Sequence, residues 1–250
     1  MQHFFRAILK ICIVSVASVL TGCSGGGGDG STGSPPSVST TAFPLQSGYK
    51  KIIASGLSKS FTMTAISGTK SCSGNGSKTS TPATTAAVFE GVTGLSATTT
   101  LSVTVPTSCT PPTTVPQSTT TTTTIEYFDS NYMPLGSKGI TQNSYSVYTA
   151  ALVIPISVSV GETGQIGTQI LYSSSTKSTK IGSIVLSYVI EPDTSSTAIV
   201  NLRSKVYDTA EVLGAIEEDR YRIDAQGTLT PISVDIQIGN STDRVNFTFN

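Results

Sequence analysis

The second half of the chain consists of short segments in which apolar and polar residues alternate, and polar turns separate these segments. In residues 232–238, Ile232, Val234 and Ile236 alternate with Ser233 and Asp235. A period of two is typical of a strand with one buried face. The turns are too short for helical crossovers, so neighbouring segments are expected to pair as antiparallel hairpins. We therefore predict that residues 144–250 form an antiparallel β-meander, either one curved sheet or an up-and-down barrel.

Two further segments of this region are assigned as follows. Residues 156–160 (ISVSV) alternate and predict a strand that ends at Gly161. Residues 209–218 (TAEVLGAIEE) are compatible with a short helix, because Val212, Leu213 and Ile216 would lie on one stripe. We favour a strand over residues 212–224 and keep the helix as the alternative.

Residues 43–128 contain a second group of β-type segments. Strands are predicted over residues 60–66, 101–105 and 119–128, whereas the glycines and asparagine of residues 70–81 predict turns, and Pro106 is expected to end its strand. The six threonines that open residues 119–128 also suit a disordered polar tract, but threonine is a good strand former. The expected product is a small β-sandwich-like module, which resembles immunoglobulin-like modules in architecture only, because the core tryptophan is missing. Residues 129–143 then form a connection.

The cysteines point to an oxidising compartment. Cys12 lies in the basic and apolar amino-terminal segment and Cys23 directly follows it, which leaves Cys72 and Cys109 as an even pair. A redox-active pair normally has close spacing, so we predict a structural disulfide within the first module. Closing a loop of this length stabilises a chain by roughly 4 kcal/mol in the chain-entropy model.

The first 22 residues have the form of a secretory signal. Residues 11–20 are mostly apolar and follow Arg6 and Lys10, but the run is too short to span a bilayer as a helix. It ends in Leu20-Thr21-Gly22-Cys23, which resembles the lipobox of bacterial lipoproteins. The resemblance implies cleavage before Cys23, a diacylglycerol on its thiol and an acyl chain on its amine. It also implies the outer membrane, since Ser24 stands where an inner-membrane lipoprotein tends to have aspartate.

Residues 23–42 are expected to be a flexible linker. They are rich in Gly, Ser, Thr and Pro and have too few apolar side chains to offset the entropy of ordering. A flexible coil of this length has ends roughly 25 Å apart. The expected organisation is therefore a signal peptide (1–22), a linker (23–42), a disulfide-containing module (43–128), a connection (129–143) and a meander (144–250).

Composition excludes several chemistries. The only histidine is His3, in the signal. Without an imidazole, the mature chain lacks Ser-His-Asp and Cys-His catalysis and His-ligated zinc. It also has no basic patch, which argues against a nucleic-acid partner. We expect no cofactor, no metal and no enzymatic activity.

Two clusters remain as candidate sites. Glu217, Glu218 and Asp219, with Asp224 nearby, could serve Ca²⁺ binding or a glycosidase pair, but neighbouring arginines favour a solvated face with cross-strand ion pairs. The second cluster is aromatic and lies around the connection; it could bind sugars or proteins, but we expect it to pack the two modules together: Tyr127, Phe128, Tyr132, Tyr145 and Tyr148.

These observations predict an all-β, membrane-anchored lipoprotein of the bacterial envelope with a structural, adhesive or binding role. The body resembles β-rich envelope lipoproteins of undefined function. The alternative is a carrier that holds a lipid or other hydrophobic ligand in the concave face of the sheet over residues 144–250. The membrane partner would be reached through the lipid on Cys23, and the sequence names no protein or glycan partner.

Overall fold

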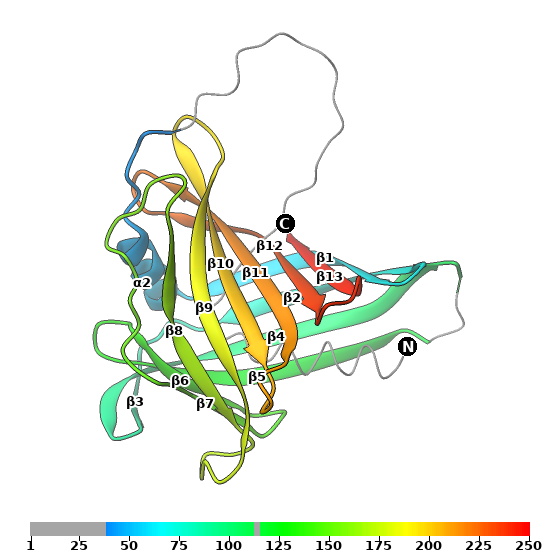
Figure 1. The fold of residues 1–250 in the computed structure, drawn as a ribbon, viewed down its shortest axis with the longest axis horizontal. Coiled ribbons are helices and arrows are strands. Elements are labelled where there is room, and N and C mark those ends of the chain that lie inside the picture. The colour runs from blue at the N-terminus through cyan, green and yellow to red at the C-terminus, as the bar shows by residue number, and fades with distance from the viewer. Residues whose placement is uncertain (1–38, 113–115) are drawn as a thin grey trace.

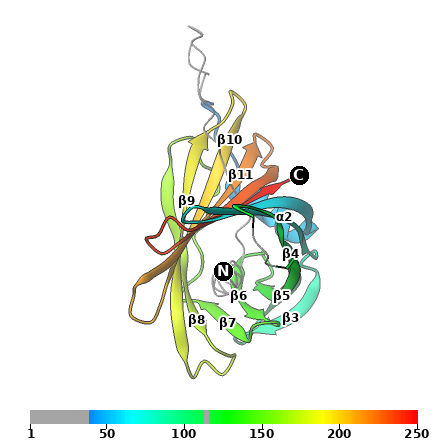
Figure 2. The ribbon, with the colours of Figure 1, turned by 90° about the vertical axis from the view of Figure 1, so that its right-hand side faces the viewer.

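Strand pairing runs without a break around a closed ring. The computed structural model describes residues 39–112 and 116–250, in which twelve antiparallel strands form a barrel and β3 pairs with β4 alone outside the ring (Figures 1 and 2). The described elements are α2 (Leu45–Ser55), β1 (Leu57–Ser67), β2 (Lys70–Ser80), β3 (Thr85–Phe89), β4 (Val92–Thr110), β5 (Ser118–Phe128), β6 (Pro134–Gly139), β7 (Ser144–Tyr148), β8 (Thr163–Tyr172), β9 (Lys180–Pro192), β10 (Thr197–Tyr207), β11 (Leu213–Asp224), β12 (Leu229–Ile238) and β13 (Arg244–Phe249).

Two pairings between strands that do not follow one another in sequence close this ring. β13 returns to β1, with Phe249 opposite Phe61, and β2 skips the β3 hairpin to pair with β4. From β4 to β13 each strand pairs with the next one in sequence. The all-β class and the antiparallel meander over residues 144–250 are thus confirmed. The meander does not close on itself, and the expected sandwich-like module is not a separate sheet, because its strands complete the same barrel.

Residues 70–80 form a strand, so the prediction of turns around Asn75-Gly76 is wrong. Gly74 and Gly76 lie on the inner face of β2, opposite Met63 and Phe61. A Cβ on Gly76 would lie 2.5 Å from the Phe61 ring and 2.1 Å from the Ser102 carbonyl oxygen. The glycines therefore make room for large side chains of β1 within a strand.

The connection expected over residues 129–143 contains β6, which pairs with β5 and β7.

Strand β4 continues through Pro106 to Thr110, whereas the sequence analysis expected it to end at Pro106. Pro106 needs no amide partner because the pairing of β4 with β5 ends at Val105, and the register with β2 shifts nearby. The alternative of a helix over residues 209–218 is also wrong, since β11 begins at Leu213.

The helix α2 was not expected from the sequence. It presents Leu45, Gly48 and Tyr49, at helical spacing, to one end of the barrel (Figure 1, left), and these three residues are its buried ones. A Cβ on Gly48 would lie 2.3 Å from the carbonyl oxygen of Gly227 in the β11–β12 turn. The glycine therefore permits close contact between the helix and the barrel rim. No helix in the described part of the chain is long and apolar enough to cross a membrane.

Residues 149–162, the β7–β8 connection, do not form the predicted strand. Leu152, Ile154 and Val158 point inward and join the core with α2, while the backbone of Val158 pairs with Phe43. The backbone amide of Gln46 donates to the carbonyl oxygen of Pro155 (3.1 Å). The helix and this connection thus cover the same end of the barrel.

The β3–β4 hairpin lies against the outside of the barrel. The Phe89 ring stacks on Tyr127 at 4.4 Å and lies 5.2 Å from the ring of Tyr145. Glu90, beside Phe89, accepts a hydrogen bond from the Tyr145 hydroxyl (2.7 Å) and forms an ion pair with Lys177. These contacts fix the hairpin across β5, β6 and β7.

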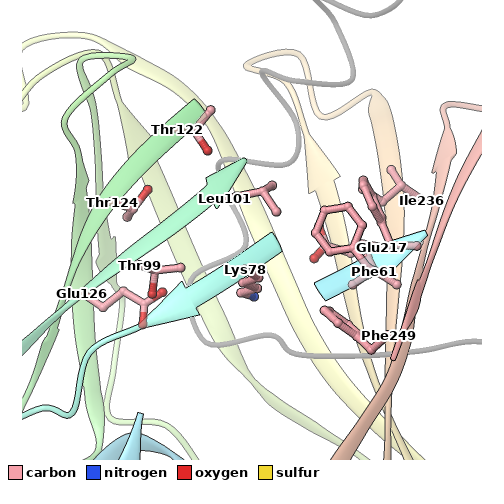
Figure 3. A pocket seen from close by; sticks show the side chains of 12 residues that line it. Phe61, Lys78, Thr99, Leu101, Thr122, Thr124, Glu126, Glu217, Ile236 and Phe249 are labelled. Carbon is pink, nitrogen blue, oxygen red and sulfur yellow. The ribbon is translucent and has the colours of Figure 1, made fainter. Parts of the chain in front are cut away.

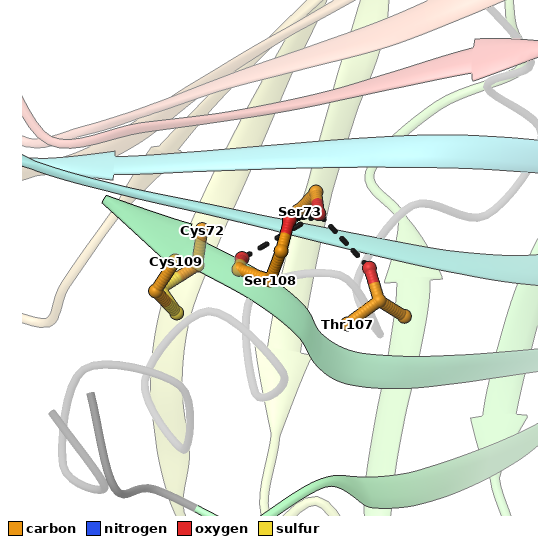
Figure 4. The surroundings of a disulfide bond; sticks show 5 residues. All are labelled: Cys72, Ser73, Thr107, Ser108 and Cys109. Atoms are coloured by element: carbon orange, nitrogen blue, oxygen red, sulfur yellow. Dashed lines mark hydrogen bonds between the residues drawn. A yellow bond between two sulfur atoms is a disulfide. The ribbon is translucent and has the colours of Figure 1, made fainter. Parts of the chain in front are cut away.

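The predicted disulfide is present. Cys72 and Cys109 face each other across β2 and β4, with their Cα atoms 4.0 Å apart (Figure 4). Beside it, Ser73 Oγ hydrogen-bonds Thr107 Oγ1 (2.9 Å) and Ser108 Oγ (2.7 Å). The disulfide therefore reinforces one of the two pairings that close the barrel.

Candidate functional site in the barrel interior

A layer of polar side chains crosses the inside of the barrel. Strand β5 turns Thr122, Thr124 and Glu126 inward because they alternate with outward-facing residues, and all three are buried. On the opposite wall β11 turns Glu217 and Asp219 inward, with exposed fractions of 3% and 0%. These two acids alternate with Glu218 along the strand and so share one face, and the structure shows that this face is the interior.

The polar layer surrounds a small cavity (Figure 3). Lys78, Thr99, Glu126 and Glu217 contribute polar atoms, whereas the remaining wall is mostly apolar and aromatic, with Phe61 prominent. Its volume is about 40 Å³. At about 10–15 Å³ for each water molecule, the cavity has room for about three.

Two further cavities continue toward α2. The middle one, of about 30 Å³, shares Lys78, Thr99 and Glu126 with the first. A third, of about 30 Å³, shares Tyr49 and Tyr221 with the middle one and is almost entirely apolar. The three cavities thus form a row of small spaces that runs from the polar layer toward α2.

Tyr49 links α2 to the polar layer. Its side chain is 8% exposed, and its hydroxyl has no hydrogen-bond partner in the structure. Burial raises the pKa of Tyr49 well above its ordinary value, and the nearby Tyr148 and Glu126 raise it further. Tyr221 behaves alike: burial raises its pKa first, followed by the charge of Asp219. Both phenols are neutral hydroxyl groups at physiological pH.

The interior acids do not form a metal centre. Within residues 39–112 and 116–250 no group of three or more His, Cys, Asp or Glu side chains could hold a metal ion. Lys78, Glu126, Glu217 and Asp219 each have an interaction partner within the protein. The layer thus resembles a satisfied internal polar network more than a site that awaits a ligand.

The remaining charges of the candidate acid cluster lie outside the barrel. Arg203 and Arg220 bind Glu218 at 2.6 Å and 3.3 Å, and Arg220 also binds Glu191 at 3.1 Å. The expected solvated face with cross-strand ion pairs is therefore present for Glu218. It is wrong for Glu217 and Asp219, which are buried in the barrel interior. Asp224 is separate from the cluster, since its Oδ1 accepts the amides of the β11–β12 turn.

The aromatic cluster predicted around the connection divides between two faces. Phe128 and Tyr148 point into the barrel core, whereas Tyr127 and Tyr145 lie outside and hold Phe89. Tyr132 packs against the small cluster around Phe128. No pair of modules is joined by these side chains, because the strands before and after them belong to one sheet.

Three residues that line the interior cavities are hard to identify from the sequence: Glu126, Lys78 and Tyr49. Glu126 shares the parity of Thr122 and Thr124, whereas Ile125 and Tyr127 lie on the other face, so alternation alone would have turned Glu126 outward. Comparison of the chain with known protein families, curated proteins and solved structures finds no match.

Cys23, the predicted acylation site, lies outside the described residues.

Proposed function

We propose that this chain is a lipid-anchored, non-catalytic protein of the bacterial envelope, with the acyl group on Cys23 and a barrel that serves a structural, adhesive or binding role. The anchor rests on the Leu20-Thr21-Gly22-Cys23 pattern and the basic, apolar segment before it. In this proposal the barrel is carried at the leaflet of the outer membrane.

The small volume of the cavity beside the interior acids is the observation that favours a non-catalytic role. Glu126 and Glu217 line one cavity, as an acid pair in an enzyme would, but its volume is about 40 Å³. Substrate sites are clefts that bury most of a molecule many times larger than water. A cavity of this size is smaller than such a site, which argues for a non-catalytic role.

Metabolic labelling with an alkyne fatty acid tests the anchor. We expect the label on the wild-type chain and its loss in Cys23→Ser, while Cys12→Ser, which changes only the signal, keeps it. Mass analysis should show that the chain begins at Cys23. An unlabelled wild-type chain, or a purified chain that retains residues 1–22, would contradict the proposal.

Cross-linking in intact envelopes followed by pull-down tests the binding role. A partner that is captured by the wild-type chain and lost when one outer face is changed would support it. Hydrolysis or transfer of an envelope component by the purified chain, abolished by Glu217→Gln, would instead show an enzyme.

The second candidate, a carrier of a hydrophobic ligand, has one observation in its favour. The cavity beneath α2 is lined by apolar side chains that include Leu45, Leu152 and Leu229. At about 30 Å³ it cannot hold a lipid unless α2 moves away from the barrel. A disulfide that joins α2 to the rim should abolish uptake of a fluorescent fatty acid if the chain is a carrier. Absence of uptake by the wild-type chain would refute this candidate.

A further inference from the structure

The β7–β8 connection exposes apolar side chains on its outer side. Val153 and Ile156 are 67% and 78% exposed, while Leu152, Ile154 and Val158 of the same segment are buried in the core. A surface loop ordinarily presents polar residues to water. This one has apolar residues on both sides.

The connection also carries no charge. Residues 149–161 contain no Asp, Glu, Lys or Arg, and the first charge after them is Glu162. The opposite rim has exposed aliphatic residues too, among them Ile181 and Val212, but Lys180 and Glu211 directly precede them. The segment around Val153 and Ile156 thus differs from these residues by its lack of charge.

The described chain begins at the same end of the barrel. Phe43 exchanges both backbone hydrogen bonds with Val158, at 2.7 Å and 2.9 Å. About 20 residues separate Phe43 from Cys23, and a coil of that length has a mean end-to-end distance of roughly 25 Å. The opposite rim lies a full strand length farther away, roughly 30 Å or more along the tilted strands. The rim with α2 is therefore the one that a lipid on Cys23 keeps nearest to the leaflet.

The helix at this rim suits a membrane surface as well. α2 carries Lys50 and Lys51; Lys51 is exposed, and its ammonium donates a hydrogen bond to the Gln226 carbonyl oxygen (2.7 Å) near Asp224. Lysines beside a leaflet are attracted to anionic headgroups. An apolar, uncharged loop beside a basic helix combines the two interactions of a protein that rests on a membrane interface.

We propose that the end of the barrel formed by α2 and the β7–β8 connection lies against the lipid leaflet, with Val153 and Ile156 inserted among the headgroups. This inference rests on the proposed acylation of Cys23. It fixes the orientation of the barrel: the opposite rim, with the β10–β11 turn, faces away from the membrane and toward any partner.

The absence of tryptophan from the chain provides the test. The full-length acylated protein is reconstituted in vesicles of phosphatidylethanolamine and phosphatidylglycerol, with or without brominated phospholipid. Ile156→Trp places the only indole on the proposed lipid-facing rim, and Val212→Trp is the matched control at the exposed opposite rim. Val153→Trp is a second reporter if Ile156→Trp does not fold.

We expect the emission of Ile156→Trp to shift to the blue in vesicles and to be quenched by the brominated lipid, while Val212→Trp keeps its emission. Equal quenching of both variants, or none in Ile156→Trp and Val153→Trp, would overturn the orientation. A blue shift that grows with protein concentration in the absence of vesicles would also overturn it, because a second copy of the chain would then cover the indole. If the wild-type chain carries no acyl group by mass and does not float with vesicles, the anchor itself is wrong and the inference falls with it.

Discussion

Phe61 is the side chain whose removal should weaken the barrel most. It is 2% exposed, and its ring meets Phe247 and Phe249 edge to face at 5.0 Å and 5.9 Å. It also covers Gly76, which has no side chain of its own to fill the space. Phe61 therefore connects β1 to both of its neighbours, β13 and β2.

We expect Phe61→Ala to lower the free energy of unfolding by about 4 kcal/mol, within the usual range of about 3–5 kcal/mol for this substitution in a core. The upper half of the range applies because each edge-to-face aromatic contact contributes about 0.5–1.5 kcal/mol beyond burial. Phe61 also borders an existing cavity of about 40 Å³, so the site cannot simply collapse. At about 2–4 °C per kcal/mol for a chain of this size, the unfolding temperature should fall by about 8–16 °C.

Urea unfolding followed by far-ultraviolet circular dichroism measures this difference. Phe61→Leu, which keeps most of the volume, should cost about 1–2 kcal/mol and serves if the alanine variant does not fold. Val88→Ala is the control, because Val88 is 68% exposed and its loss should change stability by less than about 0.5 kcal/mol. A loss of less than about 1 kcal/mol for Phe61→Ala would refute the assignment of Phe61 to the closure of the barrel.

Three other predictions follow from the same packing. Replacing both Cys72 and Cys109 by Ser should cost about 4 kcal/mol, since the disulfide closes a sequence separation of 37 residues, and free thiols in the wild-type chain under non-reducing conditions would contradict the bond. Gly76→Ala should destabilise the protein by about 1–3 kcal/mol, because the new Cβ would meet the Ser102 carbonyl oxygen and the Phe61 ring. Gly68→Ala is the control: its Cβ would meet nothing within 4 Å, and its φ of +57° alone should cost about 1 kcal/mol. Equal costs for the two variants would speak against the contact at Gly76. Lys177 lowers the pKa of Glu90 below 4.5, and the hydrogen bond from the Tyr145 hydroxyl lowers it further. The ionised Glu90 therefore stabilises the fold above pH 4.5, and this stabilisation is lost as pH falls through the folded-state pKa. Lys177→Met should raise the pKa of Glu90 in a carboxyl NMR titration, and an unchanged value would be inconsistent with the pair.

Alternation in the sequence located the strands better than it located their partners. Residues 232–238 and 245–249 alternate clearly and fall in β12 and β13. Pairing of β13 with β1 joins residues almost 200 positions apart, and no local pattern records it. The first half was therefore assigned to a module of its own, when its strands in fact complete the ring.

The misassigned segments have a common physical origin in tertiary contacts. Residues 70–80 have turn composition, yet Gly74 and Gly76 are required by the side chains of β1. Residues 156–160 alternate, but Phe43 is the only pairing partner of Val158 in the described chain, and the segment bends over the barrel end. In both cases packing against distant residues outweighs local propensity.

The width of the barrel explains the elements that the sequence analysis missed. Side chains of about eight strands suffice to fill a barrel interior, whereas twelve strands enclose a wider space. Here that space is filled from one end by Tyr49 of α2 and Ile154 of the β7–β8 connection, and across the middle by long polar side chains such as Glu126. Filling from the end explains why α2 needs only a short apolar stripe, and why a loop with apolar residues on its inner side remains ordered there. It does not explain the apolar outer side of that loop, since Val153 and Ile156 contribute nothing to the interior. The proposed placement of this rim against the leaflet, which rests on an acylated Cys23, would account for their exposure.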